Sequence, residues 1–146
     1  MGIEAEFSRR IYADPDTIWE QLGDLTTWPT WWQDCVAART LDNLSLREGS
    51  QVELLLRPRT LQMTFKPVVD LYTDRRILSL THQSAMVHST FSWQLVEKGE
   101  YVQTTATLVF NGALPFFITI AQQASNVRTS VNSAVKGLKR IAEQRY

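Results

Sequence analysis

Cysteine, unbalanced charge and long apolar runs are all scarce in this sequence. Its 146 residues include a single cysteine, Cys35, which excludes a disulfide within the chain. Fifteen basic residues balance fifteen acidic ones, so no excess of positive charge favours binding to nucleic acid. The longest apolar run, residues 113–121, is interrupted by Pro115 and Thr119 and is too short to cross a bilayer. These absences argue against a disulfide-stabilised, nucleic-acid-binding or membrane-spanning protein.

Cysteine and histidine are also too few to indicate a metal site. Cys35, His82 and His88 share no spacing of the kind that zinc ligands show. The sequence contains no Ser-His-Asp arrangement, no paired-carboxylate signature, no phosphate-binding glycine loop and no nucleotide fingerprint. We therefore predict neither a metal nor a cofactor.

The length and the N-terminus set the organisation that we expect. A chain of 146 residues suits one domain, spanning residues 1–146. A domain of this size buries about 68–70% of its unfolded surface, so a core and a modest cavity can coexist. Because no signal-like segment begins the chain and cysteine is scarce, we expect a cytoplasmic protein. We further expect a monomer or a weak homodimer.

The last third of the chain predicts one long amphipathic helix, from Pro115 to Glu143. Its apolar residues recur at steps of three and four and form one stripe: Phe117, Ile120, Ala124, Val127, Val131, Ala134, Leu138 and Ile141. Such a stripe needs an apolar surface to cover it, and a curved antiparallel sheet is the surface that this chain offers. A sheet that wraps around a helix can leave a hollow between the two, which is where we expect function to lie.

For the rest of the chain, the sequence predicts mainly strands. Alternating residues predict a strand over 3–11, and Asp14-Pro15 predicts the start of a helix that runs to about Gly23. A short helix or turn follows over 25–33. Six further strands are predicted at 35–41, 50–56, 61–72, 78–83, 90–95 and 102–110. Pro67 implies an edge or a bulge in its strand, and short loops predict an antiparallel meander.

Five short segments of the sequence resemble a known superfamily. They are Ile11–Trp19, Asp24-Leu25, Trp28–Trp32, Gly49-Ser50 and Gly137–Glu143. Together they resemble the START-like superfamily (SRPBCC, or Bet v 1-like), and most closely its polyketide cyclase/dehydrase and lipid transport group. The resemblance covers essentially the whole chain.

That resemblance implies an α+β helix-grip fold. In this fold a seven-stranded antiparallel sheet wraps around a long C-terminal helix, and two short helices lie between strands 1 and 2. The resemblance also implies an apolar cavity between the sheet, the long helix and the short helices. Members of the superfamily bind lipids, sterols, polyketides, plant hormones or other apolar molecules, and some are cyclases or dehydratases.

Tryptophan is abundant, with five residues in this chain. Trp28, Trp31 and Trp32 allow two interpretations: a platform on which a flat ligand stacks, or a plug that fills one end of the sheet beneath the short helices. We favour the plug, because large aromatic residues are more often part of the core. Trp93 lies mid-strand beside Phe91 on the inward face, so we expect both to line the cavity wall.

Polar residues on inward faces are candidates for orienting or transforming a ligand. His82 shares its strand face with two leucines, so it could hydrogen-bond a ligand, act as a general base or be an ordinary structural histidine. Tyr12 is a second candidate for proton transfer. Arg9 falls on the inner face of the first strand, either as an anchor for a carboxylate or with its charged end at the rim. Thr104 could orient a ligand from the last strand.

We expect the cavity to be lined by inward strand residues and by the stripe of the long helix. These residues are Arg9, Leu54, Met63, Phe65, Leu80, His82, Phe91, Trp93, Thr104, Ala106, Leu108, Phe117, Ile120 and Ala124. The small ones among them leave room either for a cavity or for close packing of helix and sheet. Phe117 and Ile120 would stand near the entrance, where an apolar rim suits ligand uptake or a transient contact with a membrane.

The function that we predict is binding of a small hydrophobic or aromatic molecule, such as a lipid or a polyketide-like compound, in this internal cavity. Buried apolar area would supply most of the affinity. An alternative is a cyclase or dehydratase that folds a polyketide-like chain in the same cavity, with His82 or Tyr12 moving a proton. A further alternative is a protein-interaction or chaperone-accessory module that uses Tyr72 and Val68 on the outer sheet face.

Overall fold

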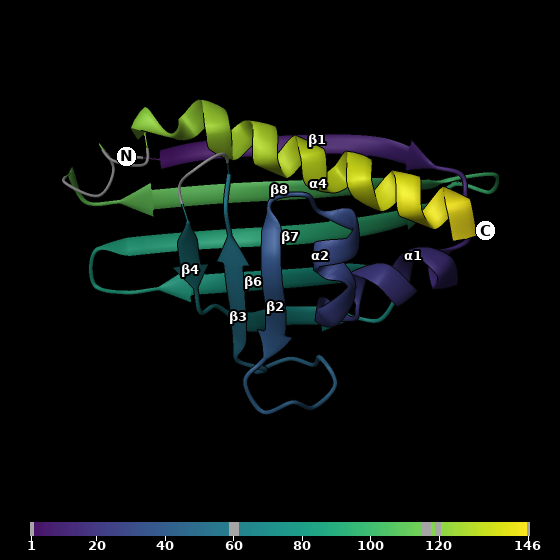
Figure 1. Cartoon of the computed structure of the whole chain (residues 1–146), viewed down its shortest axis with the longest axis horizontal. Coiled ribbons are helices and arrows are strands. Elements are labelled where there is room, and N and C mark those ends of the chain that lie inside the picture. Colours follow the sequence, from purple (N-terminus) through teal and green to yellow (C-terminus); the bar gives the residue numbers. More distant parts are fainter. Residues whose placement is uncertain (1, 59–61, 115–117, 119–120, 146) are drawn as a thin grey trace.

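Two antiparallel sheets and a long C-terminal helix make up the fold (Figure 1). The computed structural model describes residues 2–58, 62–114, 118 and 121–145. A five-stranded sheet has the order β1 (Gly2–Ile11), β8 (Val102–Gly112), β7 (Val87–Glu97), β6 (Ile77–Gln83) and β5 (Val68–Thr73). A three-stranded sheet has the order β2 (Cys35–Thr40), β3 (Val52–Leu56) and β4 (Met63–Phe65). Figure 1 shows the smaller sheet running across the larger one, and α4 (Ala124–Arg145) contacts β1 and β8.

The division into two sheets corrects the prediction of a single seven-stranded sheet. The strand predicted over 61–72 is in fact two strands, because Pro67 stands between β4 and β5 and lacks the N–H needed to continue a ladder. β4 pairs with β3, whereas β5 pairs with β6, so the chain changes sheets at this point. The α+β helix-grip arrangement itself is confirmed, with antiparallel sheet packed against a long C-terminal helix.

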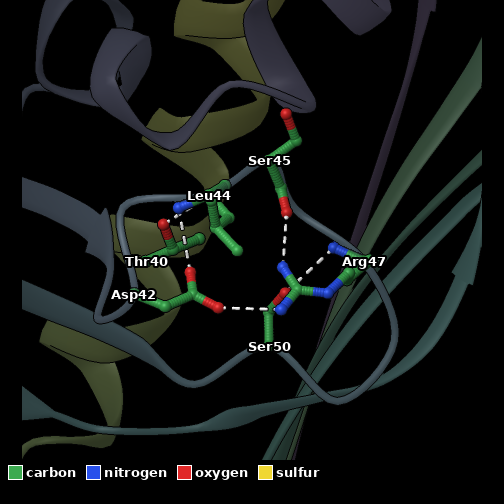
Figure 2. A network of polar contacts seen from close by, with 6 residues as sticks. All are labelled: Thr40, Asp42, Leu44, Ser45, Arg47 and Ser50. Atoms are coloured by element: carbon green, nitrogen blue, oxygen red, sulfur yellow. Dashed lines mark hydrogen bonds and ion pairs between the residues drawn. The ribbon is translucent and has the colours of Figure 1, made fainter.

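The loop between β2 and β3 is held by a polar network (Figure 2). The Arg47 guanidinium donates to the Asp42 carboxylate at 2.8 Å and to the Ser45 carbonyl at 3.1 Å, and the Arg47 N–H donates to the Ser50 hydroxyl at 3.0 Å. Asp42 also accepts from the N–H of Leu44 at 2.9 Å. The bonds from Leu44 and Arg47 hold the pKa of the Asp42 carboxyl below its usual range.

Backbone hydrogen bonds join the two sheets just beyond this loop. The N–H of Val69 donates to the Ser50 carbonyl at 2.9 Å, and the N–H of Val52 donates to the Pro67 carbonyl at 2.9 Å. Gly49 adds a third bond, from its N–H to the Val69 carbonyl at 2.8 Å. Its φ of +86° is a left-handed conformation that favours glycine. This seam closes the space between the sheets along the side where β3 meets β5.

Short helices precede β2, in the positions predicted from the sequence. They are α1 (Pro15–Leu22), the 3-10 helix η1 (Leu25–Thr27) and α2 (Trp28–Trp31). Asp14 caps α1 by accepting from the Thr17 N–H at 2.8 Å, a bond that lowers the pKa of Asp14. Asp24 caps η1 in the same way, by accepting from the Thr26 N–H at 3.1 Å.

Helix α4 starts later than the predicted position, Pro115. The N–H of Val127 donates to the Gln123 carbonyl at 2.9 Å, and the Asn126 amide donates to the Gln123 side-chain oxygen at 2.9 Å. Gln123 is a turn residue between α4 and the helical residues Ala121 and Gln122, and Leu114 and Ile118 are helical as well. Residues 115–117, 119 and 120 lie outside the described residues.

Antiparallel pairing sets the inward side chains of the five-stranded sheet in rows across the strands. The His82 row contains Ile3, Phe110, Ser89 and His82, and the Leu80 row contains Ala5, Leu108, Phe91 and Leu80. The Trp93 row contains Phe7, Ala106, Trp93 and Leu78, and the Thr104 row contains Arg9, Thr104 and Leu95. The rows follow one another along the strands, so each marks a different distance from the ends of the sheet.

A β-bulge in β5 turns Tyr72 toward the inside of the molecule. The register shifts between Val69 and Leu71, so that Tyr72 pairs with Leu78 of the Trp93 row. The Tyr72 hydroxyl accepts a hydrogen bond from Trp19 Nε1 at 3.2 Å, and the two rings meet edge-on with centroids 5.7 Å apart. The outward position expected for Tyr72 is therefore wrong, because strict alternation does not anticipate an extra residue in the strand.

Candidate functional site

A hollow of about 120 Å³ lies between the five-stranded sheet, the three-stranded sheet and α4. The larger sheet contributes the whole His82 row and all of the Leu80 row except Ala5. The smaller sheet contributes inward side chains of β3 and β4, and α4 contributes one turn and a half of its apolar face. The wall is almost entirely apolar, and its polar side chains are those of His82, Ser89 and Ser130.

Half of the predicted cavity residues lie on this wall. They are Leu54, Met63, Phe65, Leu80, His82, Phe91 and Leu108. All of them come from strands whose alternation of apolar and polar residues marks the inward face. The pairs Leu54–Phe65 and Leu80–Phe91 are direct cross-strand neighbours, one on each sheet. The two sheets therefore present facing apolar surfaces to the same space.

Trp93, Thr104 and Ala106 do not line the hollow, although the sequence predicts them there. All three side chains are fully buried, in the Trp93 and Thr104 rows. Trp31 stands edge-on to Trp93, with ring centroids 5.8 Å apart and an interplanar angle of 88°. The inward face at the Trp93 row is thus covered by the Trp31 ring of α2.

The tryptophans of α2 fill that end of the sheet, in agreement with the plug interpretation. Trp28 packs against Trp31 with centroids 5.5 Å apart and donates from Nε1 to the Leu22 carbonyl at 3.0 Å. Trp32, which directly follows α2, donates from Nε1 to the Ser130 carbonyl of α4 at 3.1 Å. Trp32 also lies on the wall of the hollow, so it separates the plug from the open space.

The backbones of α4 and α2 come close together at Gly137. A Cβ atom at this position would stand 1.7 Å from the carbonyl oxygen of Trp31, and real Cβ atoms do not come so near. Glycine is needed here because of the close approach of the two backbones. This contact holds α2, with its tryptophans, against α4.

Arg9, Ala124, Phe117 and Ile120 also fall outside the wall. The Arg9 guanidinium donates to the Asn132 side chain of α4 at 3.0 Å and to the Ser8 carbonyl at 2.9 Å, because the Thr104 row lies beyond the plug. Arg9 is therefore not in position to anchor a carboxylate in the hollow. Ala124, the first residue of α4, is half-buried, and Phe117 and Ile120 lie outside the described residues.

Several residues on the wall are not among the cavity residues that the sequence predicts. They are Ile3, Trp32, Leu56, Pro58, Pro67, Ser89, Phe110, Val127, Ser130 and Val131. Alternation along the strands was sufficient to find Ser89, which stands two residues before Phe91, and the helical stripe already contained Val127 and Val131. Pro58 and Pro67 gave no such signal, since their position depends on how the smaller sheet folds over the larger one.

His82 and Ser89 are two of the three polar side chains on the wall, and they lie next to each other. They are direct partners across β6 and β7, and both side chains are half-buried. No hydrogen bond to either side chain is present among the residues that the structure describes. A neutral imidazole offers one donor and one acceptor, and a hydroxyl offers both. This pair can therefore bind a polar group at the His82 row.

Tyr12, the other candidate for proton transfer, lies far along β1 from the hollow. It follows Ile11, at the opposite end of β1 from Ile3, and its side chain is 49% exposed. Its ring packs against Tyr101 with centroids 5.8 Å apart and lies beneath the Lys139 ammonium at 5.1 Å. Tyr12 therefore does not line the hollow.

The single cysteine is buried and unreactive. Burial raises the pKa of the Cys35 thiol to about 12, so the thiol stays protonated at neutral pH. Nor does any group of three or more His, Cys, Asp or Glu side chains in the described ranges have a geometry suited to a metal ion. Within those ranges, no helix is long and apolar enough to cross a membrane.

Comparison with known families shows which family the chain belongs to. The model of the family described as polyketide cyclase/dehydrase and lipid transport matches residues 2–143. The chain therefore belongs to this family, and the START-like resemblance of its sequence is confirmed. No curated protein matches the chain in sequence.

Solved structures share the fold over nearly the whole chain. The Zhui aromatase/cyclase from Streptomyces sp. R1128 has a TM-score of 0.79 at 18% identity, covering 99% of this chain and 96% of that one. Major latex-like protein 151 from Panax ginseng has a TM-score of 0.73 at 13% identity, covering 95% and 96%. A START superfamily protein from Mycobacterium smegmatis has a TM-score of 0.65 at 15% identity, covering 97% and 95%. Identities this low show the fold alone, and family and fold fit either ligand binding or a polyketide cyclase-type function.

Proposed function

We propose that this protein binds a small apolar molecule in the hollow between its two sheets and α4. The observation that carries the proposal is the wall itself, on which apolar side chains from three separate elements face one space. Removing ligand surface from water there contributes about 25 cal/mol per Å² of apolar area, before the cost of immobilising the ligand.

The size of the hollow narrows the class of ligand. Its volume is about 120 Å³. An engineered apolar cavity of about 150 Å³ accepts benzene, whereas pockets for drug-sized ligands measure about 300–1,000 Å³. The hollow in this conformation therefore suits a single ring or a short aliphatic chain. A sterol or a folded polyketide would require the smaller sheet to move away from α4.

Cyclase-type catalysis is the second candidate, favoured by the presence of His82 on the wall. Catalysis of this kind uses side chains that move protons, placed within hydrogen-bond reach of the reacting group. On the wall as described, His82 is the titratable side chain, and neither Tyr12 nor a carboxylate stands beside it. Binding without chemistry therefore has more support from the structure than catalysis.

An interaction module that uses the outer sheet face has less support. Of the two residues that would mark such a surface, Tyr72 is turned inward and hydrogen-bonded to Trp19. Val68 is 40% exposed but stands at the start of an edge strand. An isolated exposed valine is ordinary on a protein surface.

The first experiment is native mass spectrometry of the purified protein, followed by solvent extraction of anything that it carries. A released apolar compound would support the proposal and identify the ligand. The same spectra test whether the protein is a monomer or a weak homodimer.

The second experiment measures toluene binding by thermal shift and NMR titration. We expect the Leu108→Trp variant to lose binding, because the larger side chain fills the hollow. The matched control is Thr107→Trp, which places the same ring on the neighbouring residue of β8, on the opposite face of the sheet. Absence of toluene binding to the unmodified protein, or equal loss in both variants, would contradict the proposal.

A further inference from the structure

The adjacent polar side chains of His82 and Ser89 on the wall point to a more specific ligand. We infer that the hollow selects a one-ring aromatic molecule that carries an uncharged hydroxyl group, with the ring in the apolar interior and the hydroxyl at His82 and Ser89. This inference rests on the proposed function and adds to it the chemistry of the ligand.

The position of the polar pair gives the ligand a direction. Trp32 marks the inner end of the hollow, where its ring packs against Phe91 with centroids 5.6 Å apart, and its side chain is 2% exposed. His82 and Ser89 belong to the next row outward and are half-buried. An aromatic ring placed against Trp32 and Phe91 therefore has its substituent at the His82 row.

The aromatic lining favours a ring over an aliphatic chain. Trp32, Phe65 and Phe91 come from the C-cap of α2, the smaller sheet and the larger sheet respectively, so aromatic side chains face the hollow from three parts of the fold. Aromatic pairs gain energy beyond their buried area when they adopt offset or edge-on geometries. With a volume of about 120 Å³, the hollow accommodates one such ring.

The charge of the wall favours a neutral hydroxyl over a carboxylate. No lysine or arginine lies on the wall among the described residues, and Arg9 is bonded elsewhere, to Asn132. A hydroxyl both donates and accepts, which matches the donor and acceptor that His82 and Ser89 provide. A ligand without such a group leaves both side chains unpaired in a largely apolar space, and a site with unpaired polar groups discriminates against that ligand.

The test compares two ligands of nearly equal shape, p-cresol and toluene, which differ in one hydroxyl. Dissociation constants come from NMR titration of the full chain. We expect p-cresol to bind about tenfold more tightly than toluene, the effect of a hydrogen bond of ordinary strength. In the double variant His82→Leu/Ser89→Ala we expect toluene to bind as before and the preference for p-cresol to fall below about twofold.

A matched control lies on the opposite face of the same two strands. Thr81 and Thr90 are cross-strand partners, next to His82 and Ser89 in sequence, and their hydroxyls are 3.2 Å apart. The double variant Thr81→Val/Thr90→Val removes two hydroxyls from β6 and β7 without changing the wall. We expect it to keep the full preference for p-cresol.

The possible results of these titrations distinguish this inference from the proposed function on which it rests. Equal binding of the two ligands to the unmodified protein overturns the inference and leaves the proposed function in place. Binding of neither ligand overturns both. A preference that survives in His82→Leu/Ser89→Ala, or that disappears equally in the threonine control, overturns the assignment to His82 and Ser89. Retained toluene binding in each variant shows that the fold and the hollow are intact.

Discussion

The inner face of the five-stranded sheet has a filled end and a hollow end. The filled end comprises the Trp93 and Thr104 rows with the tryptophans of α2, and the hollow end comprises the His82 and Leu80 rows with the facing strands of the smaller sheet. The same strands run through both ends with the same alternation. Ala106, a small residue, lies at the filled end, whereas Leu108 and Phe91 line the hollow. The difference shows that an opening arises from what stands opposite the sheet, and not from small residues within it.

We expect the largest effect on stability at Gly137, where α4 lies directly against α2 at the filled end. Substitution Gly137→Ala places a Cβ 1.7 Å from the Trp31 carbonyl, so α2 and α4 must separate. We expect a loss of about 3 kcal/mol or more in the free energy of unfolding, measured by urea denaturation. The neighbouring exposed residue provides the control, since Lys136→Ala should change stability by less than about 0.5 kcal/mol. A gain of about 1 kcal/mol in Gly137→Ala, as helix propensity alone predicts, would show that the close approach is absent in solution.

Substitutions that enlarge a side chain should lower the stability more at the filled end of the sheet than at the hollow end. Ala106→Val enlarges a fully buried side chain at the filled end, where we expect a cost of about 1–3 kcal/mol. Val131→Leu enlarges a side chain that borders the hollow, where the added group has space and stability should change by less than about 1 kcal/mol. Thermal and urea unfolding of the two variants measure the contrast. Equal losses would mean that the hollow is closed in solution.

Two tryptophans of the filled end differ in their hydrogen bonding, which a pair of substitutions can measure. Trp28 Nε1 donates to the Leu22 carbonyl, whereas Trp93 Nε1 is a buried donor without a partner among the described residues. Trp28→Phe and Trp93→Phe make the same change in volume, but only the first removes a hydrogen bond. We expect Trp28→Phe to cost about 1–3 kcal/mol more than Trp93→Phe in urea unfolding. A larger cost for Trp93→Phe would reveal a hydrogen-bond partner for its indole.

A pH-dependent effect is expected at Cys35, a buried residue that closely follows Trp32 in sequence. Its pKa is about 12 in the folded protein against 9.0 for a solvent-exposed thiol, so the unfolded chain releases its proton first as pH rises. The thiol therefore contributes stability that is complete below pH 9 and is lost as pH rises toward 12. We expect the stability advantage of the unmodified protein over Cys35→Ala to shrink between pH 9 and pH 11. A constant difference across that range would mean that the thiol is solvated.

Local patterns in the sequence are sufficient for most strands, for the caps of the short helices and for seven of the seventeen residues on the cavity wall. Alternation identifies the face of a strand to which Leu80, Phe91 and Trp93 belong. It does not tell how far along that face the plug extends, and this is why Trp93 and Ala106 were expected on the wall. That boundary depends on contacts between distant parts of the chain, such as Trp31 with Gly137.

The remaining errors have equally specific physical causes. Pro67 predicts an edge or a bulge within one strand, but the exchange of pairing partners that divides the strands into two sheets is a property of the whole fold. The bulge in β5 inserts one residue and so reverses the direction of Tyr72. Neither feature has a local signal strong enough to overcome the regular alternation around it.

The pairing of β1 with β8 has a consequence for how the protein acquires its cavity. Gly2 pairs with Asn111, so the strand made first joins the sheet only after nearly the whole chain is available. The hairpins that link β5 to β8 close short loops, whereas β1 closes a very long one, and contacts of that separation slow folding. We therefore expect Ile3, the contribution of β1 to the wall, to dock late in folding, and the hollow to be open to solvent on that side until it does.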